Sequence, residues 1–322
     1  MNEFELIERH FRREVRDPAV RIGIGDDAAV VMPAPGMELA FSVDMLVEGR
    51  HFLAGVDPTA LGHKTLAVNL SDMAAMGATP RWALLAGALP DNDERWLAEF
   101  ANGLFALAQR FGVTLIGGDT TRGPRNLCVT IVGELPPGAA ITRSGARAGD
   151  DVYVSGTLGD AALALAALSG KTRIAAAALA PLRQRLERPE PRVALGERLR
   201  GIATAALDLS DGLTGDFAHI LDASGLGADL ELARIPCSPV LAQRLATEER
   251  ELALACVLAG GDDYELCFTA SSSAREQLAA VADALALPLT RIGSVNAARG
   301  LRVRDERGAP VSPLPAAYDH FR

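Results

Sequence analysis

The side chains most able to do chemistry in this sequence are aspartates that stand beside Gly, Ser or Thr at the ends of apolar segments. They occur in GIGDD, FSVDM, NLSDM, IGGDTT, LDLSDG and AGGDDYE, and they are Asp26, Asp27, Asp44, Asp72, Asp119, Asp208, Asp211, Asp262 and Asp263. Any single one of them is most simply explained as a turn or a helix cap. Six such segments in one chain favour a different explanation, in which carboxylates that close buried strands face a common cleft.

Carboxylates gathered in one cleft would repel one another unless cations lay between them. Hard oxygen ligands select Mg²⁺, Ca²⁺ or Mn²⁺. Mg²⁺ usually takes one or two protein carboxylates and completes its coordination shell with water and substrate phosphates. The aspartate pattern therefore predicts a site for a nucleotide with Mg²⁺.

Two common nucleotide-binding motifs do not account for this pattern. GIGDDA, at residues 23–28, fits the G-x-G-x-x-A dinucleotide fingerprint. That fingerprint places a pyrophosphate on bare backbone N–H groups, and here Asp26 and Asp27 would repel it, so NAD is disfavoured. The sequence contains no GxxxxGK[ST] loop, so an enzyme of this kind must hold ATP through metal ions and scattered side chains.

Helices and strands are needed to bring these aspartates together. Apolar periodicity and capping residues predict helices near residues 2–15, 58–77, 93–111, 159–170, 192–200, 213–225, 239–258 and 273–286. Strand patterns lie near residues 23–31, 37–47, 81–89, 113–118, 126–135, 146–156, 201–208, 227–235, 264–270, 289–295 and 300–308. The long helix at 58–77 carries Asp72 near its C-terminal end.

Composition limits the classes of protein that remain. The chain has 322 residues, 49% of them hydrophobic and 23% charged, which predicts a globular protein of two domains. The break at Pro136-Pro137-Gly138 gives the domain bounds as 1–137 and 138–322, and each domain is expected to mix α and β elements. Its net charge of −9 disfavours nucleic acid as a partner. The sequence shows neither a membrane-spanning apolar run nor a signal-peptide core, so we expect a cytoplasmic protein with no membrane partner. The four cysteines are scattered and predict no disulfide framework or zinc site.

Taken in order, several motifs match a known family. GIGDDAAVV, SVDMLVEGRHF, HKTLAVNLSDMAAMGATP, LIGGDTTRG, TRSGARAGD, LDLSDGL, GGDDYELCFT and the terminal YDHF closely resemble the bacterial thiamine-monophosphate kinases from about residue 4 to residue 321. The resemblance implies the aminoimidazole-ribonucleotide-synthetase-like ATP-binding superfamily and an α/β (α+β) fold. In such proteins an N-terminal mixed α/β domain binds Mg-ATP and forms a barrel with a second copy, and a C-terminal α/β domain completes the nucleotide and substrate site.

The resemblance also implies a reaction. ATP, as co-substrate, would phosphorylate thiamine monophosphate to thiamine diphosphate in thiamine diphosphate biosynthesis, with several Mg²⁺ ions and a homodimeric enzyme. A phosphate monoester is already ionised at neutral pH, so it needs no base to act as a nucleophile. The chemistry requires alignment of two polyanions and neutralisation of the transferred group, which bridging Mg²⁺ ions can supply with direct in-line transfer.

Individual roles follow from the same resemblance. It assigns as metal ligands Asp27, Ser42, Val43 through its backbone, Asp44, Asp72, Asp119, Asp208 and Asp211. It assigns as nucleotide contacts Gly118, Asp119, Arg143 and Ser210, and as substrate contacts His51, Asp262 and Tyr318. The group expected to act directly in catalysis is Asp44, Asp119, Arg143 and Asp208. Relatives often have Thr at position 43 and commonly have Glu at position 262.

No role in the reaction is favoured for three further basic residues. Lys64 is expected to be a solvated lysine, and Arg122 and Arg125 to lie in a mobile loop without a favoured role in ATP binding.

Two other functions remain possible on sequence grounds. One is a superfamily relative that phosphorylates an amide or a selenide, and the other is a metal–nucleotide-binding regulatory subunit without turnover.

Overall fold

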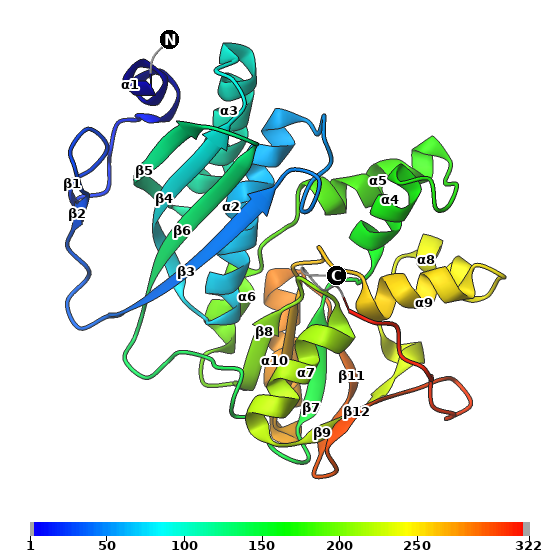
Figure 1. Cartoon of the computed structure of the whole chain (residues 1–322). Helices are drawn as coiled ribbons and strands as arrows, with labels where there is room; N and C mark the ends of the chain where they lie inside the picture. Colours follow the sequence, from blue (N-terminus) through cyan, green and yellow to red (C-terminus); the bar gives the residue numbers. More distant parts are fainter. Residues whose placement is uncertain (1–2, 318–322) are drawn as a thin grey trace. The chain divides into compact units, whose positions relative to one another are not determined.

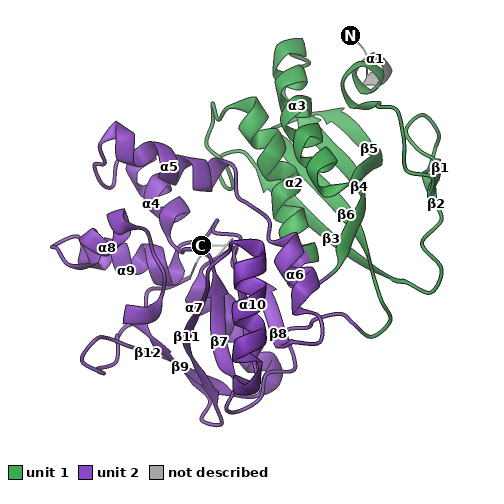
Figure 2. Ribbon diagram, turned by 180° about the vertical axis from the view of Figure 1, so that it is seen from behind, with its two compact units in different colours: residues 1–73, 78–138 green, residues 74–77, 139–322 purple. Residues whose placement is uncertain are grey.

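The computed structural model describes residues 3–317, and the chain divides into two compact units. The first unit comprises residues 1–73 and 78–138, and the second comprises residues 74–77 and 139–322 (Figure 2). Each unit combines a β-sheet with helices, which confirms the α/β (α+β) class predicted from the sequence. No helix in the described part of the chain is long and apolar enough to cross a membrane.

The first unit is built on a four-stranded sheet in the order β3-β6-β4-β5 (Figure 1). Its strands are β3 (Glu38–Val47), β4 (Thr79–Leu89), β5 (Thr114–Arg122) and β6 (Asn126–Leu135). The β4–β5 pair is parallel, whereas β6 runs antiparallel to both of its neighbours. Helices α2 (Pro58–Ala75) and α3 (Glu94–Phe111) cover one face of this sheet (Figure 1).

Local sequence explains where these two helices begin and how closely they pack. Asp57 accepts a hydrogen bond from the Ala60 amide before α2, and Asp93 caps α3. At their contact, a Cβ added to Gly62 would lie 2.0 Å from the Phe100 carbonyl oxygen. A Cβ on Gly103 would similarly lie 1.9 Å from the backbone of α2. Only glycine permits this close approach of α2 to α3.

The opposite face of the same sheet carries a short strand pair, β1 (Val20–Ile22) with β2 (Val30–Val31). Val20 and Val31 pack against a small core of Trp82, Ile116 and Val132. The continuous strand predicted over residues 23–31 is therefore wrong for most of its length. The loop that replaces it contains the GIGDD motif, in which Gly25 has a φ of 117°.

The N-terminal helix is also shorter than predicted. The described part of it consists of α1 (Glu3–Leu6) and the π-helical turn η1 (Ile7–Phe11), and Arg12 is already extended with a ψ of 125°. The predicted continuation to residue 15 is almost entirely charged, so it offers no apolar face that packing could stabilise.

The second unit contains a six-stranded sheet in the order β12-β9-β11-β7-β10-β8. Its strands are β7 (Asp151–Ser155), β8 (Ala203–Asp208), β9 (Gly227–Glu231), β10 (Leu266–Ala270), β11 (Leu289–Asn296) and β12 (Gly300–Arg304). Its helices are α4 (Asp160–Leu168), α5 (Ala176–Glu187), α6 (Val193–Leu199), α7 (Leu213–Ser224), α8 (Pro239–Leu245), α9 (Arg250–Ala259) and α10 (Arg275–Leu285), with short turns η2 (Leu232–Arg234) and η3 (Ser272–Ala274). All pairings are antiparallel except β12 with β9.

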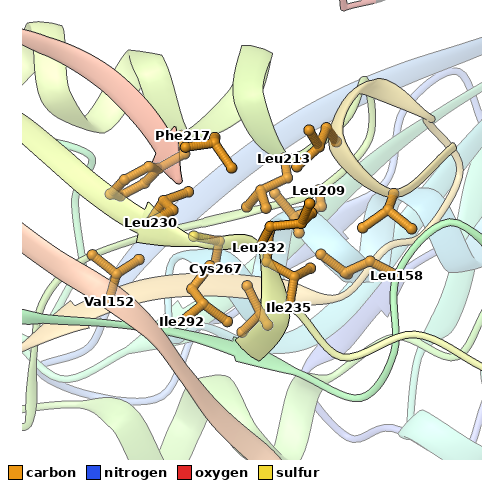
Figure 3. Packing of buried hydrophobic residues seen from close by; sticks show 14 of the residues in the cluster. Val152, Leu158, Leu209, Leu213, Phe217, Leu230, Leu232, Ile235, Cys267 and Ile292 are labelled. Carbon is orange, nitrogen blue, oxygen red and sulfur yellow. The ribbon is translucent and has the colours of Figure 1, made fainter. Parts of the chain in front are cut away.

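A large apolar core holds this second unit together. Figure 3 shows Phe217 of α7 close to Leu230 and Cys267 of the sheet, and Leu213 of α7 close to Leu209. The Cys267 side chain is completely buried, as are those of Phe217 and Ile292. The core keeps β8 and β10 rigid, and the segments that follow β8 and precede β10 carry the predicted site residues.

Two helix predictions for this unit need correction. Helix α5 was not predicted, because its alanine-rich sequence lacks clear periodicity and contains Pro181. The single helix predicted over 239–258 is two helices, separated by a turn in which the Thr247 hydroxyl accepts a hydrogen bond from the Glu249 amide.

Candidate active site

The first group of predicted site residues lies between β3 and α2. The Ser42 hydroxyl donates a 2.5 Å hydrogen bond to Asp72 Oδ2, and the Asp44 amide donates a 3.1 Å bond to Asn69 Oδ1. Asn69 in turn donates from Nδ2 to the Thr65 carbonyl one helical turn earlier. Ser42 and Asp44 alternate with exposed residues along β3, so both face the helix. The structure thus brings three predicted ligands together and adds Asn69, which sequence reasoning missed.

His51 occupies a tight turn directly after β3. Its Nδ1 accepts a 3.0 Å hydrogen bond from the Val47 amide, which means that Nδ1 carries no proton and that the other ring nitrogen, Nε2, is the one able to donate. The same turn is held from the opposite side by Lys64, whose Nζ donates to the His51 carbonyl at 3.2 Å. The prediction that Lys64 is a solvated lysine is wrong, because its residue surface is only 3% exposed.

Asp119 lies on a different face of the sheet from Asp44. In the strand register Asp119 is paired with Ala86, Ala86 with Cys128, and Cys128 with Met45. Paired residues in a sheet project to the same face, so Asp119 shares the face of Met45, while Asp44 projects to the opposite face. About three strand spacings, or roughly 14 Å, also separate β5 from β3. Within one chain, the first unit does not bring these two carboxylates together.

Two further predicted residues, Asp27 and Val43, belong to the face that carries Asp119. Asp27 is exposed in the loop that joins β1 to β2, and that strand pair packs on the Trp82 side of the sheet. The Val43 side chain is 59% exposed and offers no donor, so only its backbone could serve a metal ion. Gly118 has a φ of 153°, and a Cβ there would lie 1.8 Å from the Leu85 carbonyl oxygen, which requires glycine for packing reasons alone.

The second unit brings together the LDLSDG and GGDDYE segments. The Leu209 amide donates to the Glu265 carbonyl at 2.9 Å, and the Tyr264 amide donates back to the Leu209 carbonyl at 2.8 Å. One step further, the Asp262 amide donates to the Ser210 carbonyl at 2.9 Å. This short ladder places Asp262 beside the predicted nucleotide and metal residues Asp208, Ser210 and Asp211.

Asp216 supports the turn that presents Asp211. Its Oδ2 accepts hydrogen bonds from the Asp211 and Gly212 amides at 2.9 and 3.0 Å. Burial raises the pKa of Asp216 to about 6, although the amide donors oppose that shift. The Asp211 amide is therefore bound by Asp216, and the Asp211 side chain projects from a turn whose backbone is fixed.

Arg143 approaches the same edge of the second sheet. The carbonyl of its neighbour Thr142 accepts a 3.1 Å hydrogen bond from the Ala206 amide, so this segment runs beside β8, which ends at Asp208. The Arg143 side chain is exposed. Tyr318, the third predicted substrate contact, lies outside the described residues.

The arginines expected in a mobile loop are held in place. Arg125 forms a 2.6 Å ion pair with Glu48, and its guanidinium lies 4.5 Å from the centre of the Trp96 ring. Arg122 ends β5 and donates to the Pro90 carbonyl. Both contacts brace the segments around His51 and β5.

Taken as a set, the predicted metal ligands fall into three groups. Ser42, Asp44 and Asp72 lie between β3 and α2, Asp27, Asp119 and Val43 lie toward the other face of the first sheet, and Asp208 and Asp211 follow β8. Over residues 3–317, no three His, Cys, Asp or Glu side chains form a group that could hold a metal ion. Mg²⁺ requires only one or two protein carboxylates, so the pairs are chemically suitable, and the metal assignments stay predictions.

Comparisons with known proteins identify the class of protein to which this fold and these residues belong. Residues 25–135 match the AIR synthase related protein N-terminal domain, and residues 147–306 match the corresponding C-terminal domain. The chain therefore belongs to the AIR synthase related family. Hydrogenase maturation protein HypE shares the fold with a TM-score of 0.77 at 21% identity.

Within that family the chain is a member of the thiamine-monophosphate kinases. It is 48% identical over 324 residues to the enzyme of Escherichia coli (strain K12), covering 99% of this chain and 98% of that protein. It is 41% identical to the Haemophilus influenzae enzyme, covering 100% and 98%. The crystal structure of thiamine-monophosphate kinase from Stenotrophomonas maltophilia K279a matches with a TM-score of 0.86 at 46% identity, covering 94% and 96% of the two chains. AaThiL, solved in complex with AMPPCP and TMP, matches with a TM-score of 0.78 at 30% identity, covering 90% and 89%.

The contact between Lys64 and His51 gives a testable expectation. Lys64→Met keeps much of the side-chain volume but removes the donor to the His51 carbonyl, so the turn over residues 47–52 should open more often. A charge-assisted hydrogen bond of this kind contributes about 1.5–3 kcal/mol, and we expect amide hydrogen exchange in the turn to accelerate by roughly tenfold or more. Hydrogen exchange followed by mass spectrometry measures this directly.

The exposed Arg50, in the same turn, supplies the control variant. Arg50→Ala should leave exchange in the turn near its original rate. Unchanged exchange in Lys64→Met would show that the lysine contact does not hold the turn.

Proposed function

We infer that this protein transfers the γ-phosphoryl group of ATP to the phosphate of thiamine monophosphate, giving thiamine diphosphate and ADP. The observation that carries this conclusion is the 48% identity over essentially the whole length of a thiamine-monophosphate kinase. The motifs GIGDD, NLSDM, LDLSDG and GGDDYE supply the carboxylates that this chemistry needs. Because ATP is the donor, we place the reaction in the cytoplasm.

Mg²⁺ is proposed as the ion that makes the reaction possible in an acidic protein. The candidate donors are hydroxyl and carboxylate oxygens, which suit Mg²⁺, and Ser42 already lies 2.5 Å from Asp72. We propose that Asp44 and Asp72 in the first unit and Asp208 and Asp211 in the second hold such ions. When bound, Mg²⁺ would neutralise charge on the phosphates of ATP and of the transferred group.

The residues of the chain itself would align the two substrates. His51, held through Nδ1 by the Val47 amide, presents Nε2 as a donor suited to the acceptor phosphate. Arg143 is exposed beside the end of β8, where its guanidinium would pair with a phosphate of ATP. Since the acceptor is already an anion, we propose direct in-line transfer without a phosphorylated enzyme intermediate.

Asp262 is proposed to recognise the organic part of the acceptor. Thiamine monophosphate carries a fixed positive thiazolium ring, for which a carboxylate is a suitable partner. The backbone bond from Asp262 to Ser210 sets this carboxylate beside a predicted nucleotide contact, which fits an acceptor that must lie next to ATP. Tyr318 would contribute an aromatic face to the same substrate.

A homodimer is proposed from the free face of the first sheet. Leu39, Phe41, Val43 and Met45 project from β3 on the side away from α2, and the last three are half-exposed or more. Such an apolar stripe on an outer strand is costly in water and favours cover by a second copy. β3 and β5 are the outer strands of the sheet. If the sheets of two copies paired, the face that carries Asp119 in one copy would also lie against the face that carries Met45 in the other copy.

The function itself is tested by ADP release from ATP with a panel of phosphorylated acceptors. We expect thiamine monophosphate to be the preferred acceptor and excess EDTA to abolish turnover. Asp44→Asn should reduce kcat by at least about 100-fold, because it keeps side-chain volume but removes one charge that holds the metal in the transition state.

Asp91→Asn, an exposed substitution outside the site, is the matched control and should retain normal kcat. Near-normal kcat in Asp44→Asn would remove Asp44 from the catalytic group. Melting temperatures measured for both variants separate a loss of catalysis from a loss of fold.

The acceptor role of Asp262 has its own test. Asp262→Ala should raise KM for thiamine monophosphate by roughly 5- to 150-fold, which corresponds to the loss of one charge-assisted contact of about 1–3 kcal/mol. KM for ATP should change less than about threefold. Asp262→Glu restores the residue that relatives commonly have and should be nearly neutral, whereas equal increases in both KM values for Asp262→Ala would show that Asp262 serves the metal cluster instead.

The dimer proposal is tested by Phe41→Glu, which places a charge on the 66% exposed apolar residue at the centre of the stripe. We expect the wild-type protein to sediment as a dimer and the variant to sediment as a monomer, because a buried charge at an interface is strongly unfavourable. Leu53→Glu, at an exposed apolar residue outside the stripe, should remain dimeric. A monomeric wild type, or a dimeric Phe41→Glu, would contradict the proposal.

A further inference from the structure

The backbone of the GGDDYE segment adopts an unfavourable conformation that depends on contacts with its surroundings. Asp262 and Tyr264 both adopt the left-handed conformation, with φ values of 68° and 49°. This region is unfavourable for residues other than glycine and costs about 1–2 kcal/mol for each one. Such strain persists only where surrounding contacts over-determine the loop.

The residues that alternate with these two are buried carboxylates. Asp263 is 4% exposed, and both of its oxygens accept hydrogen bonds from the Gly159 amide at 2.9 and 3.0 Å. Burial raises the pKa of Asp263 well above its ordinary value, despite the Gly159 donor. Glu265 is completely buried. Asp262 therefore directly precedes a run of three buried residues, Asp263, Tyr264 and Glu265.

Glu265 is held by four hydrogen bonds from three side chains. Its Oε2 accepts hydrogen bonds from the Ser155 hydroxyl at 2.6 Å and from Arg192 Nε at 2.7 Å. Its Oε1 accepts from Arg185 Nη2 at 2.7 Å and from Arg192 Nη2 at 2.5 Å. A Cβ on Gly156 would lie 2.3 Å from Oε1, so even the backbone beside the carboxylate is shaped to admit it.

Three separate segments thus converge on one carboxylate. Arg185 comes from α5, Arg192 precedes α6, and Ser155 ends β7. The Glu265 backbone carbonyl simultaneously accepts from the Leu209 amide, the first rung of the ladder that ends at Asp262. Any shift of Glu265 would therefore be transmitted through this ladder to Tyr264 and Asp262, the two residues in the left-handed conformation.

We propose that Glu265, clamped by Arg185 and Arg192, is a positioning residue that sets the place of Asp262 and thereby the affinity for the phosphate acceptor. This inference rests on the proposed function, in which Asp262 contacts the acceptor. Glu265 itself touches no substrate. Its effect passes through the backbone of residues 262–265.

The same domain contains a matched control for a buried carboxylate held by two arginines. Asp151 is 2% exposed and accepts from Arg275 and Arg291 at 2.6 Å each. In the sheet register it pairs with Ala270, at the end of β10 remote from Glu265. Removing its charge should therefore disturb stability to a similar extent without reaching the GGDDYE segment.

The experiment compares Glu265→Gln with Asp151→Asn in the full-length protein. Both variants should lower the melting temperature, because each leaves two arginines without their carboxylate. Only Glu265→Gln should raise KM for thiamine monophosphate, by about tenfold or more, with KM for ATP changing less than about threefold. Equal effects of the two variants on KM, or no effect of Glu265→Gln, would overturn the proposal.

A double variant shows whether the effect passes through Asp262. If it does, Asp262→Ala combined with Glu265→Gln should have nearly the same KM for thiamine monophosphate as Asp262→Ala alone. Additive increases would mean that Glu265 acts by another route and would contradict the inference. Arg192→Lys, which keeps the charge but cannot donate from both Nε and Nη2, provides a milder variant if Glu265→Gln does not fold.

Hydrogen exchange at the amides of Asp262 and Tyr264 separates failure of this inference from failure of the proposed function. Exchange at these amides should accelerate in Glu265→Gln and stay unchanged in Asp151→Asn, whatever the acceptor is. Faster exchange together with no preference of the wild type for thiamine monophosphate would reject the function and keep the positioning role. Unchanged exchange would reject the positioning role.

Discussion

Repulsion between carboxylates is the constraint on which the site residues of this structure depend. A protein with a net charge of −9 places a row of aspartates at the ends of buried strands, where each would favour moving away from the others and into water. The structure counters this tendency with hydrogen-bond donors of its own. Asp72 accepts from the Ser42 hydroxyl, Asp216 from two amides of the preceding turn, and Asp263 from the Gly159 amide. Of these, Asp72 is fixed by Ser42 before any ion is bound, as the proposed Mg²⁺ site would require.

The first sheet uses its two faces for different purposes. The face toward α2 carries Ser42 and Asp44, and its packing is tight enough that Gly62 and Gly103 are needed where α2 meets α3. The other face carries Asp119 on β5 and the exposed apolar stripe on β3. One chain therefore splits the predicted metal ligands of this unit between two faces. Closure with a second copy, as proposed above, would give the exposed face an interior.

The sequence predicted most strands and the longer helices because strand ends, caps and breaks are local signals. Asp93 before α3 and Gly112 after it are visible in the sequence and function as caps in the structure. Contacts between distant segments were not visible. Asn69 and Lys64 resemble ordinary helix residues, and only the packing of α2 against β3 shows that one holds the Asp44 amide and the other the His51 carbonyl. Glu265 was part of a recognised motif, but its arginine partners lie about 75 residues away and could not be inferred from spacing.

Whether lysine or arginine contacts a buried acceptor follows from the geometry of that acceptor. Lys64 and Lys171 are the lysines of this chain, which otherwise uses arginine throughout. Arginine suits the carboxylates of Glu265 and Asp151, since its planar fork can donate two hydrogen bonds to two oxygens at once. Lys64 instead donates to a backbone carbonyl oxygen, that of His51. The ammonium group of Lys64 is compact and stands on a flexible stem, so it can reach this carbonyl oxygen from a packed helix. A guanidinium at the same position would bring further donors into a space where the Lys64 side chain is already buried. The ammonium of Lys64 is thus suited to its contact with the His51 carbonyl, in the turn that carries the predicted substrate-binding histidine.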